Sequence, residues 1–370
     1  MIREIGSIYE LDRSMLGFDS ELEDNIITAG YKANGYPCVC TVASGREAIL
    51  LAIKDIEKRL GKKNGITCLI PEYTCDTVIM PFEYHEYNID YYSVTDDMQP
   101  EYEDVAGKLE CMPDVVFVHA YYGKDTLENI RPLLLEYKKN GGIIIEDMTQ
   151  CAFMEPDYSA DYYVMSLRKW LHAPDGGLLI TDSPVDIKIM TERSDFVKSK
   201  WIALTQKSDY LSEVNSGNYE YMQSYKQEFL ALNRTAESML DDDLNIYKMS
   251  QKSLYIANST DWDSMRKRRE CNARYLDRNL AACRSIRCPL TYNGDEAPLY
   301  YPVYSDKRDE LQKRLQQEQI YAPVLWLVPP QMGCVSKKAS YIYEHMLALP
   351  CDDRYSEDDM ERICNVLKEC

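Results

Sequence analysis

Short apolar runs alternate with amphipathic stretches over the first two-thirds of the chain. In residues 46–60, apolar side chains recur every three or four positions, the spacing of a helix with one buried face. Residues 127–139 have a similar pattern and end at Asn140-Gly141-Gly142, a typical helix stop. The predicted strands between and after these helices are residues 67–73, 89–94, 114–121, 143–147, 162–167 and 177–181. Strands spaced by helices, several of them almost entirely apolar, predict an α/β fold with a mainly parallel sheet between helices.

From about residue 184 the chain has a different pattern. It is mainly helical and charged up to residue 282, apart from the tyrosine-rich segment 210–225, which we interpret as a loop. Short strands at 300–304 and 320–326 and a helix that begins at Ser356 follow. We expect a large α/β domain over residues 1–250 and a small C-terminal α+β domain over residues 251–370. The first 30 residues or so are expected to pack on the small domain.

Composition limits the partners. The chain has 42 Lys and Arg against 61 Asp and Glu, a net charge of −19, so it repels nucleic acid and anionic membrane surfaces. No apolar run is long enough to span a membrane, and the polar N-terminus lacks a signal sequence. Thirteen scattered cysteines in a chain of this size indicate reduced thiols, and hence a cytoplasmic protein. No metal is expected, because the Cys38-x-Cys40 pair has no second cluster beside it.

Two charged residues follow predicted strands, where active sites of parallel sheets lie. Asp147 ends the apolar run 143–147, although an aspartate there could also cap the next helix. Lys169 comes 22 residues later (169 − 147), directly after the predicted strand 162–167. Most lysines belong to solvated surfaces, so neither residue identifies a site alone.

A predicted anion site at the start of the helix 46–60 suggests one ligand for all of these residues. Ser44-Gly45-Arg46 opens the helix at 46–60, and a helix N-terminus with free N–H groups binds anions. An amine, a carboxylate and a phosphate site are what pyridoxal 5'-phosphate requires. Lys169 would form the Schiff base, Asp147 would pair with the ring nitrogen, and Ser44, Gly45 and Arg46 would hold the phosphate.

The chain resembles the DegT-type aminotransferases, a family of fold-type I pyridoxal-phosphate enzymes best known for acting on nucleotide-linked keto-sugars. The resemblance extends over nearly the whole chain and rests on the order and spacing of several short motifs. These are Ser44-Gly45-Arg46-Glu47-Ala48, Ile70-Pro71-Glu72-Tyr73-Thr74, His119-Ala-Tyr-Tyr-Gly123, Glu146-Asp147-Met-Thr-Gln150, Lys169 with Gly176-Gly177, Arg269-Glu-Cys-Asn272-Ala273, Ile320-Tyr-Ala-Pro323-Val-Leu-Trp326 and Leu349-Pro350. The resemblance implies a large PLP-transferase-like domain and a homodimer. It also implies that Gln150 lies beside the ring hydroxyl and that His119 contacts the ring.

The chain departs from the family pattern at three places. The family's phosphate serine lies five residues before the lysine, whereas Ser166 lies three before Lys169. The family's ring-stacking aromatic falls at Cys75, and Tyr73 is the candidate replacement. The family's Gly-x-Asn-x-Arg loop, which reaches the phosphate of the partner subunit, has no counterpart in residues 210–250.

The predicted function is therefore PLP-dependent amino transfer from an amino acid to a small carbonyl acceptor, such as a nucleotide-linked keto-sugar. Lys169 and Asp147 are the predicted catalytic residues. Two alternatives stay open: other PLP chemistry, as in a lyase or desulfurase, and a binding or regulatory protein without turnover. The acceptor itself is not identified by the sequence.

Overall fold

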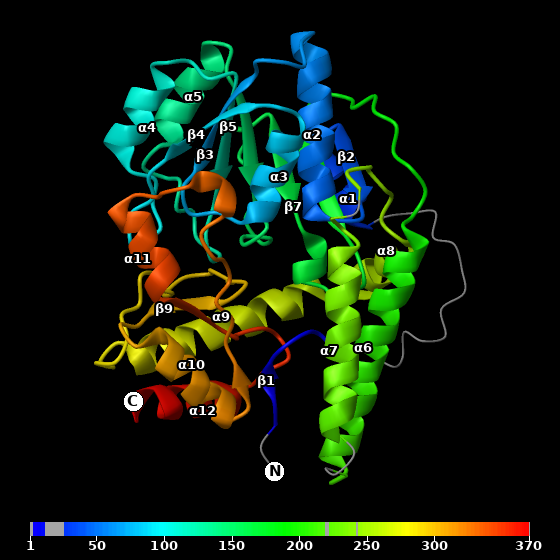
Figure 1. The fold of residues 1–370 in the computed structure, drawn as a ribbon, viewed down its shortest axis with the longest axis vertical. Helices are drawn as coiled ribbons and strands as arrows, with labels where there is room; N and C mark the ends of the chain where they lie inside the picture. The colour runs from blue at the N-terminus through cyan, green and yellow to red at the C-terminus, as the bar shows by residue number, and fades with distance from the viewer. Residues whose placement is uncertain (1–2, 12–25, 219–221, 242, 370) are drawn as a thin grey trace. The chain divides into compact units, whose positions relative to one another are not determined.

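The computed structural model describes residues 3–11, 26–218, 222–241 and 243–369. Contacts divide the chain into two compact units. Figure 1 labels the helices and strands that they contain. Unit 1 comprises Ile8–Gly61 and Tyr162–Thr260, and unit 2 comprises Ile2–Ser7, Lys62–Asp161 and Asp261–Cys370. The two units interleave along the chain, and the division at residue 250 stays a prediction.

The central sheet has seven strands. They are β2 (Cys38–Val42), β3 (Thr67–Pro71), β4 (Asn88–Tyr92), β5 (Val115–His119), β6 (Ile143–Asp147), β7 (Tyr162–Met165) and β8 (Gly177–Thr181). Their order is β2-β8-β7-β6-β5-β3-β4. The pairs β3–β4, β3–β5 and β5–β6 are parallel, whereas β8 is antiparallel to both β2 and β7. The predicted α/β class with a mostly parallel sheet is confirmed.

Burial along the strands follows the order of the sheet. Every residue of β5 and β6 is buried, as expected for strands inside the sheet, and both are continuous apolar runs up to their last residues. The edge strand β4 instead has exposed residues at Asn88 and Asp90. The polar residues that end β5 and β6, His119 and Asp147, are therefore placed by strands that the hydrophobic effect holds firmly.

Unit 1 contains the helix predicted at 46–60. Its helices are α1 (Ile26–Ala33), α2 (Gly45–Leu60), α6 (Ser194–Asn215), α7 (Met222–Ser238) and α8 (Gln251–Ser259), with a 3-10 turn η2 (Leu167–Lys169). Ser44 caps α2, because its hydroxyl accepts a hydrogen bond from the N–H of Glu47 (3.3 Å). Such a cap stabilises a helix by about 1 kcal/mol. At the other end, Gly61 has a φ of 65° and donates to the carbonyl of Lys58, the left-handed stop that glycine favours.

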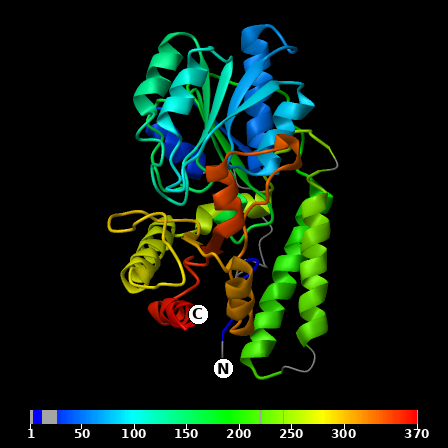
Figure 2. The ribbon, with the colours of Figure 1, turned by 60° about the vertical axis from the view of Figure 1, so that its left-hand side comes forward.

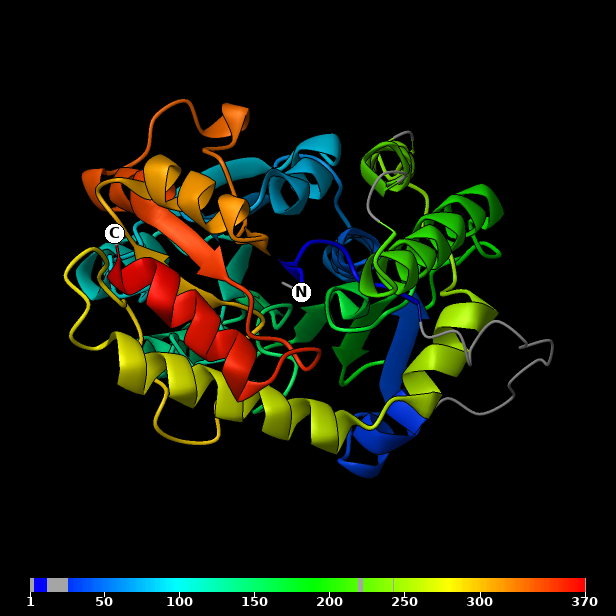
Figure 3. The same ribbon diagram turned by 90° about the horizontal axis from the view of Figure 1, so that it is seen from below.

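Unit 2 adds two small sheets to its strands β3–β6. Strand β1 (Ile5–Gly6) pairs in parallel with β10 (Ile320–Tyr321), and β9 (Tyr301–Tyr304) pairs antiparallel with β11 (Met346–Leu349). The helices are α3 (Asp76–Tyr84), α4 (Tyr102–Leu109), α5 (Arg131–Lys139), α9 (Trp262–Leu280), α10 (Arg308–Gln317), α11 (Lys337–His345) and α12 (Glu357–Lys368), with a 3-10 turn η3 (Pro330–Met332). Helix α12 packs along α9 (Figure 3).

The N-terminal residues divide between the two units. Gly6 donates to the hydroxyl of Tyr355 (2.7 Å), which ties β1 to the C-terminal part of unit 2. In unit 1, Leu11 donates to the carbonyl of Leu204 (3.2 Å). Residues 12–25, on which the rest of the N-terminal prediction falls, lie outside the described residues.

Some predicted elements differ from the structure. The segment 210–225 is not one loop, because α6 continues to Asn215 and α7 begins at Met222 (Figure 2); residues 219–221 lie outside the described residues. The strand predicted at 320–326 ends at Tyr321, shortly before Pro323, which has no N–H to donate to a neighbouring strand. The helix predicted at 127–139 begins only at Arg131, next to Pro132, because proline is favoured in the first turn of a helix.

Candidate functional site

The predicted catalytic carboxylate lies at the end of β6. Asp147 is directly opposite His119, the last residue of β5, in the register of the sheet. Its Oδ2 lies 3.4 Å from Nδ1 of His119, and both residues are buried. On the other side of the imidazole, Nε2 lies 2.6 Å from the hydroxyl of Thr74. Thr74, His119 and Asp147 therefore form a continuous polar chain inside unit 2.

The alternative role of Asp147 as a helix cap is wrong. Residues 148–161 form turns and bends and contain no helix. The second carboxylate oxygen, Oδ1, instead accepts a hydrogen bond from the N–H of Thr149 (2.7 Å). One oxygen thus fixes the turn while the other faces His119, so the carboxylate has a defined orientation.

The residues predicted beside the cofactor ring surround this chain in unit 2. Tyr73 is fully buried, and its hydroxyl lies 3.1 Å from that of Tyr122. Gln150 is also buried and accepts a hydrogen bond from the N–H of Tyr122 (2.9 Å). Cys75 is half-buried at the start of α3, where its thiol lies 3.0 Å from the hydroxyl of Thr77.

The predicted phosphate residues meet within unit 1. A Cβ on Gly45 would lie 2.9 Å from the Cβ of Ser166, and a Cβ on Gly177 would overlap the carbonyl of Ser44. The two glycines therefore allow three chain segments to approach each other closely. In the described part of the chain, no group accepts a hydrogen bond from the backbone N–H of Gly45 or Arg46. Free N–H groups at a helix N-terminus, next to a buried serine hydroxyl, fit a phosphate.

The side chain of Arg46 points to a different partner. Its Nη1 donates to the carbonyl of Leu240 (2.7 Å) and to Oδ1 of Asp241 (2.6 Å), just beyond α7. The guanidinium is thus occupied within unit 1, and its predicted contact with a phosphate stays a prediction. The backbone N–H of Arg46 is the part of this residue that fits an anion.

Lys169 ends the 3-10 turn that follows β7, as its position after a predicted strand indicated. Its side chain is half-buried, and among the described residues none forms a hydrogen bond or ion pair with its Nζ. Its carbonyl accepts a hydrogen bond from Tyr9 (3.3 Å), whose ring stacks on His172 at 4.5 Å. The turn is therefore held in place, while the amine has no partner in the part of the chain that the structure describes.

Sequence reasoning missed several residues that shape these two groups. Tyr9 holds the turn of Lys169, and the hydroxyl of Tyr343 accepts a hydrogen bond from the N–H of Thr74 (3.0 Å). The ring of Trp326 lies against that of His119, with centroids 5.9 Å apart. The one signal in the sequence was that Thr74 and Trp326 fall inside family-like motifs, which carry no information about contacts.

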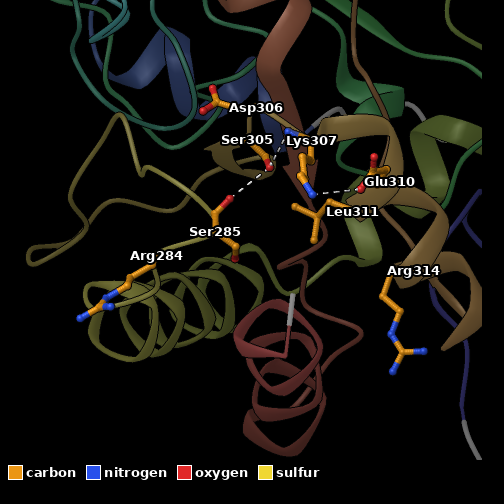
Figure 4. Close-up of a pocket in the computed structure, with 8 residues that line it drawn as sticks. All are labelled: Arg284, Ser285, Ser305, Asp306, Lys307, Glu310, Leu311 and Arg314. Carbon is orange, nitrogen blue, oxygen red and sulfur yellow. Dashed lines mark hydrogen bonds and ion pairs between the residues drawn. The ribbon is translucent and has the colours of Figure 1, made fainter.

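A separate cavity in unit 2 contains none of the predicted site residues (Figure 4). It has a volume of about 500 Å³ and is lined by Arg284, Ser285, Ser305, Asp306, Lys307, Glu310, Leu311 and Arg314. Lys307 pairs with Glu310 at 3.6 Å, and both side chains are largely exposed.

Among the described residues, every helix is too short or too polar to span a membrane.

Comparison with known proteins supports the predicted resemblance. The model of the DegT/DnrJ/EryC1/StrS aminotransferase family matches residues 250–368. A search of curated proteins gave no match. Among solved structures, the chain is similar to the sugar aminotransferase CalS13 from Micromonospora echinospora, with 16% identity, a TM-score of 0.68 and full coverage of both chains.

Two further structures share the fold. PseC from Helicobacter pylori, an aminotransferase involved in the biosynthesis of pseudoaminic acid, is 12% identical over 99% of both chains, with a TM-score of 0.69. The GDP-4-keto-6-deoxymannose-3-dehydratase ColD is 13% identical over 92% of this chain and 91% of its own, with a TM-score of 0.65. At these identities the likeness establishes the fold alone. The predicted resemblance is confirmed: residues 250–368 match the DegT/DnrJ/EryC1/StrS aminotransferase family, and the whole chain has the fold of the aminotransferases CalS13 and PseC.

Proposed function

We propose that this protein is a PLP-dependent aminotransferase that transfers an amino group from an amino acid to a carbonyl acceptor, namely a nucleotide-linked keto-sugar. The observation that carries the proposal is the buried carboxylate of Asp147 with His119 beside it at the end of a parallel sheet. Such a carboxylate is the partner that a protonated pyridine nitrogen requires. The match to an aminotransferase family and the similarity to the aminotransferases CalS13 and PseC support the reaction class.

The donor set fits pyridoxal 5'-phosphate. When bound, this cofactor supplies an aldehyde that condenses with amines and a ring that withdraws electrons from the substrate. The N–H groups of Gly45 and Arg46 and the hydroxyls of Ser44 and Ser166 would bind the phosphate. Gln150, Cys75 and His119 are proposed to lie beside the ring, with the buried Tyr73 packed behind them.

The chain's own residues would divide the proton transfers between them. The Nζ of Lys169 would hold the aldehyde and, once released, would act as general base and acid in each half of the reaction. It would take the proton from the Cα of the donor in the first half and deliver a proton to the acceptor's carbon in the second. Its lack of a partner among the described residues leaves the amine available for this role. Asp147 would hold the proton of the ring nitrogen, and His119 would keep its carboxylate in position.

The remaining properties follow from the same proposal. The partners are small molecules, an amino acid and a keto-sugar nucleotide, and no nucleic acid or membrane takes part. We propose a homodimer in a cytoplasm with reduced thiols. No disulfide links the cysteines that the structure describes, which agrees with such a compartment.

The absorption spectrum of the purified protein tests the cofactor and its lysine. Added PLP should give a visible band, and borohydride should fix the cofactor on the peptide that contains Lys169. Lys169→Ala should abolish both effects, whereas Lys198→Ala, a substitution of an exposed lysine in the same unit, should retain them. A band that survives Lys169→Ala, or no band at all, contradicts the proposal.

A second candidate is PLP chemistry without amino transfer, because ColD, which shares this fold, is a 3-dehydratase. Glutamate distinguishes the two reactions. An aminotransferase should lose its visible band when glutamate is added without an acceptor, and 2-oxoglutarate should appear in equal amount. A band that persists favours the dehydratase-like reaction, or a protein without turnover.

A further inference from the structure

Five aromatic rings of unit 2 gather around the end of β5. This aromatic cluster consists of Tyr73, His119, Tyr121, Trp326 and Tyr343. The ring of Trp326 lies 4.8 Å from that of Tyr73, 5.9 Å from that of His119 and 6.4 Å from that of Tyr121. Tyr343 completes the cluster at 5.1 Å from Tyr73. Trp326 thus packs on Tyr73, His119 and Tyr121 and belongs to the centre of the cluster.

Burial separates Trp326 from the rest of the aromatic cluster. Tyr73, His119, Tyr121 and Tyr343 are all buried, with at most 4% of their surface exposed. Trp326 is half-buried, and the next residues, Leu327 and Val328, are 76% and 39% exposed. A side chain that packs on a ligand must present a face to it. In the aromatic cluster, that face belongs to Trp326.

The position of Trp326 relates it to the proposed catalytic carboxylate. Its indole plane is tilted by only 32° from the imidazole of His119. Nδ1 of the same imidazole lies 3.4 Å from Oδ2 of Asp147. Trp326 and Asp147 therefore both lie against His119, which places the half-buried indole near the carboxylate proposed to bind a ring nitrogen.

The two sequence-based candidates for a ring contact are less suitable. Tyr73 has no exposed surface, since Tyr121, Trp326 and Tyr343 enclose it. Cys75 has no ring, and its thiol contacts Asp76 (3.2 Å) and Thr77 (3.0 Å) at the start of α3. Neither residue offers a flat surface to a flat ligand.

We propose that Trp326 is a positioning residue, the aromatic surface against which the pyridine ring of the cofactor packs. This inference rests on the proposed function, because it requires that PLP binds. The free energy gained when two aromatic rings pack together corresponds to a change in affinity of up to about tenfold. Losing the indole should therefore weaken cofactor binding, whereas a smaller aromatic ring should preserve most of it.

The test is a PLP titration of the full chain, followed by absorbance and by equilibrium dialysis without substrates. Trp326→Ala should raise the dissociation constant roughly tenfold, and Trp326→Phe should restore it to within about threefold of the unmodified chain. The control is Trp262→Ala, which removes a half-buried tryptophan at the start of α9. The ring of Trp262 contacts that of Phe153, which is not a member of the aromatic cluster. It should leave the constant unchanged.

Thermal unfolding without cofactor separates this role from a structural one. Trp326→Ala and Trp326→Phe should be compared at temperatures at which both are folded. A difference in affinity then reflects contacts with the cofactor and not a loss of folded protein. If Trp326→Ala binds PLP as tightly as Trp262→Ala, Trp326 has no positioning role, while the proposed function stands. If the unmodified chain binds no PLP, both the inference and the proposed function are wrong.

Discussion

Two carboxylates in unit 1, the buried Glu47 and the half-buried Glu237, differ in pKa according to the cations beside them. Burial raises the pKa of Glu47 to about 7, and Arg193, 3.9 Å away, lowers it too weakly to offset the burial. Burial also acts on Glu237, but Lys200 at 2.6 Å and Arg168 at 2.8 Å outweigh it and lower the pKa to about 2. Coulombic attraction falls with distance, so close cations decide whether a buried carboxylate stays charged.

The raised pKa of Glu47 predicts a pH-dependent stability. Between its ordinary value of 4.5 and about 7, the unfolded chain loses this proton while the folded chain keeps it. Rising pH therefore costs stability over this range, by at most about 3 kcal/mol. Glu47→Gln can still accept hydrogen bonds from the N–H groups of Ala43 and Tyr247 and has no proton to lose. Its stability relative to the unmodified chain should rise from pH 4.5 to 7 and then level off.

Urea unfolding at several pH values measures this difference. Glu310→Gln, which alters an exposed carboxylate of α10, is the matched control and should show a flat difference. A Glu47→Gln curve that stays parallel to that of the unmodified chain would falsify the prediction.

At the scale of elements, the pair α6 and α7 is fastened to the turn of Lys169. The two helices lie side by side and share a small core of Phe196, Val197, Ala236 and Leu240 (Figures 1 and 2). Glu237 of α7 also binds Lys200 of α6 and Arg168, the neighbour of Lys169. Residues 210–250, which lack the family's Gly-x-Asn-x-Arg loop, thus contain the end of α6 and the whole of α7.

Glu237→Gln should destabilise this helix pair by about 1–2 kcal/mol, because Lys200 and Arg168 would remain partly buried without a carboxylate. Water at the half-exposed Glu237 keeps the effect below that of a fully buried ion pair. Glu228→Gln, at an exposed position on the same helix, should change stability by less than about 0.5 kcal/mol. The free energy of unfolding from urea titrations checks both values. Equal effects of the two substitutions would show that the ion pairs contribute nothing beyond helix propensity.

At the scale of the whole molecule, the net charge of −19 does not oppose a phosphate ligand. A helix N-terminus acts within about one turn, and salt screens more distant charges. The free N–H groups of Gly45 and Arg46 can therefore attract an anion on an acidic protein. Nucleic acid differs from a small phosphate in this respect, because it contacts an extended surface and would be repelled by the net negative charge.

Cofactor binding should stabilise the whole protein. At a PLP concentration one hundred times the dissociation constant, the free energy of unfolding should rise by about 2.7 kcal/mol. Pyridoxal, which lacks the phosphate, should give a much smaller rise at the same concentration, because the N-terminus of α2 then has no anion to bind. Urea unfolding with each ligand checks this. Equal stabilisation by both compounds would refute a phosphate site at α2.

Local pattern in the sequence determined most elements of the fold. The bounds of β6 and β8 match the prediction, and the cap of α2 forms at Ser44. These features depend on residues close together in the chain: the alternation or continuity of apolar side chains, and a hydroxyl within reach of a helix terminus. The same local logic placed Asp147 and Lys169 at strand ends. Their roles toward PLP stay predictions.

Contacts between distant residues were decided only by the tertiary structure. Arg168 and Glu237 are 69 residues apart, and the sequence around each of them does not predict their ion pair. His119 meets Asp147 because β5 lies beside β6, and Trp326 reaches His119 from a segment that the sequence assigned to a strand. Periodicity records which face of an element is buried, but it does not record which elements become neighbours. The sequence by itself thus determined the elements and the candidate chemistry, and the order of packing decided which side chains meet.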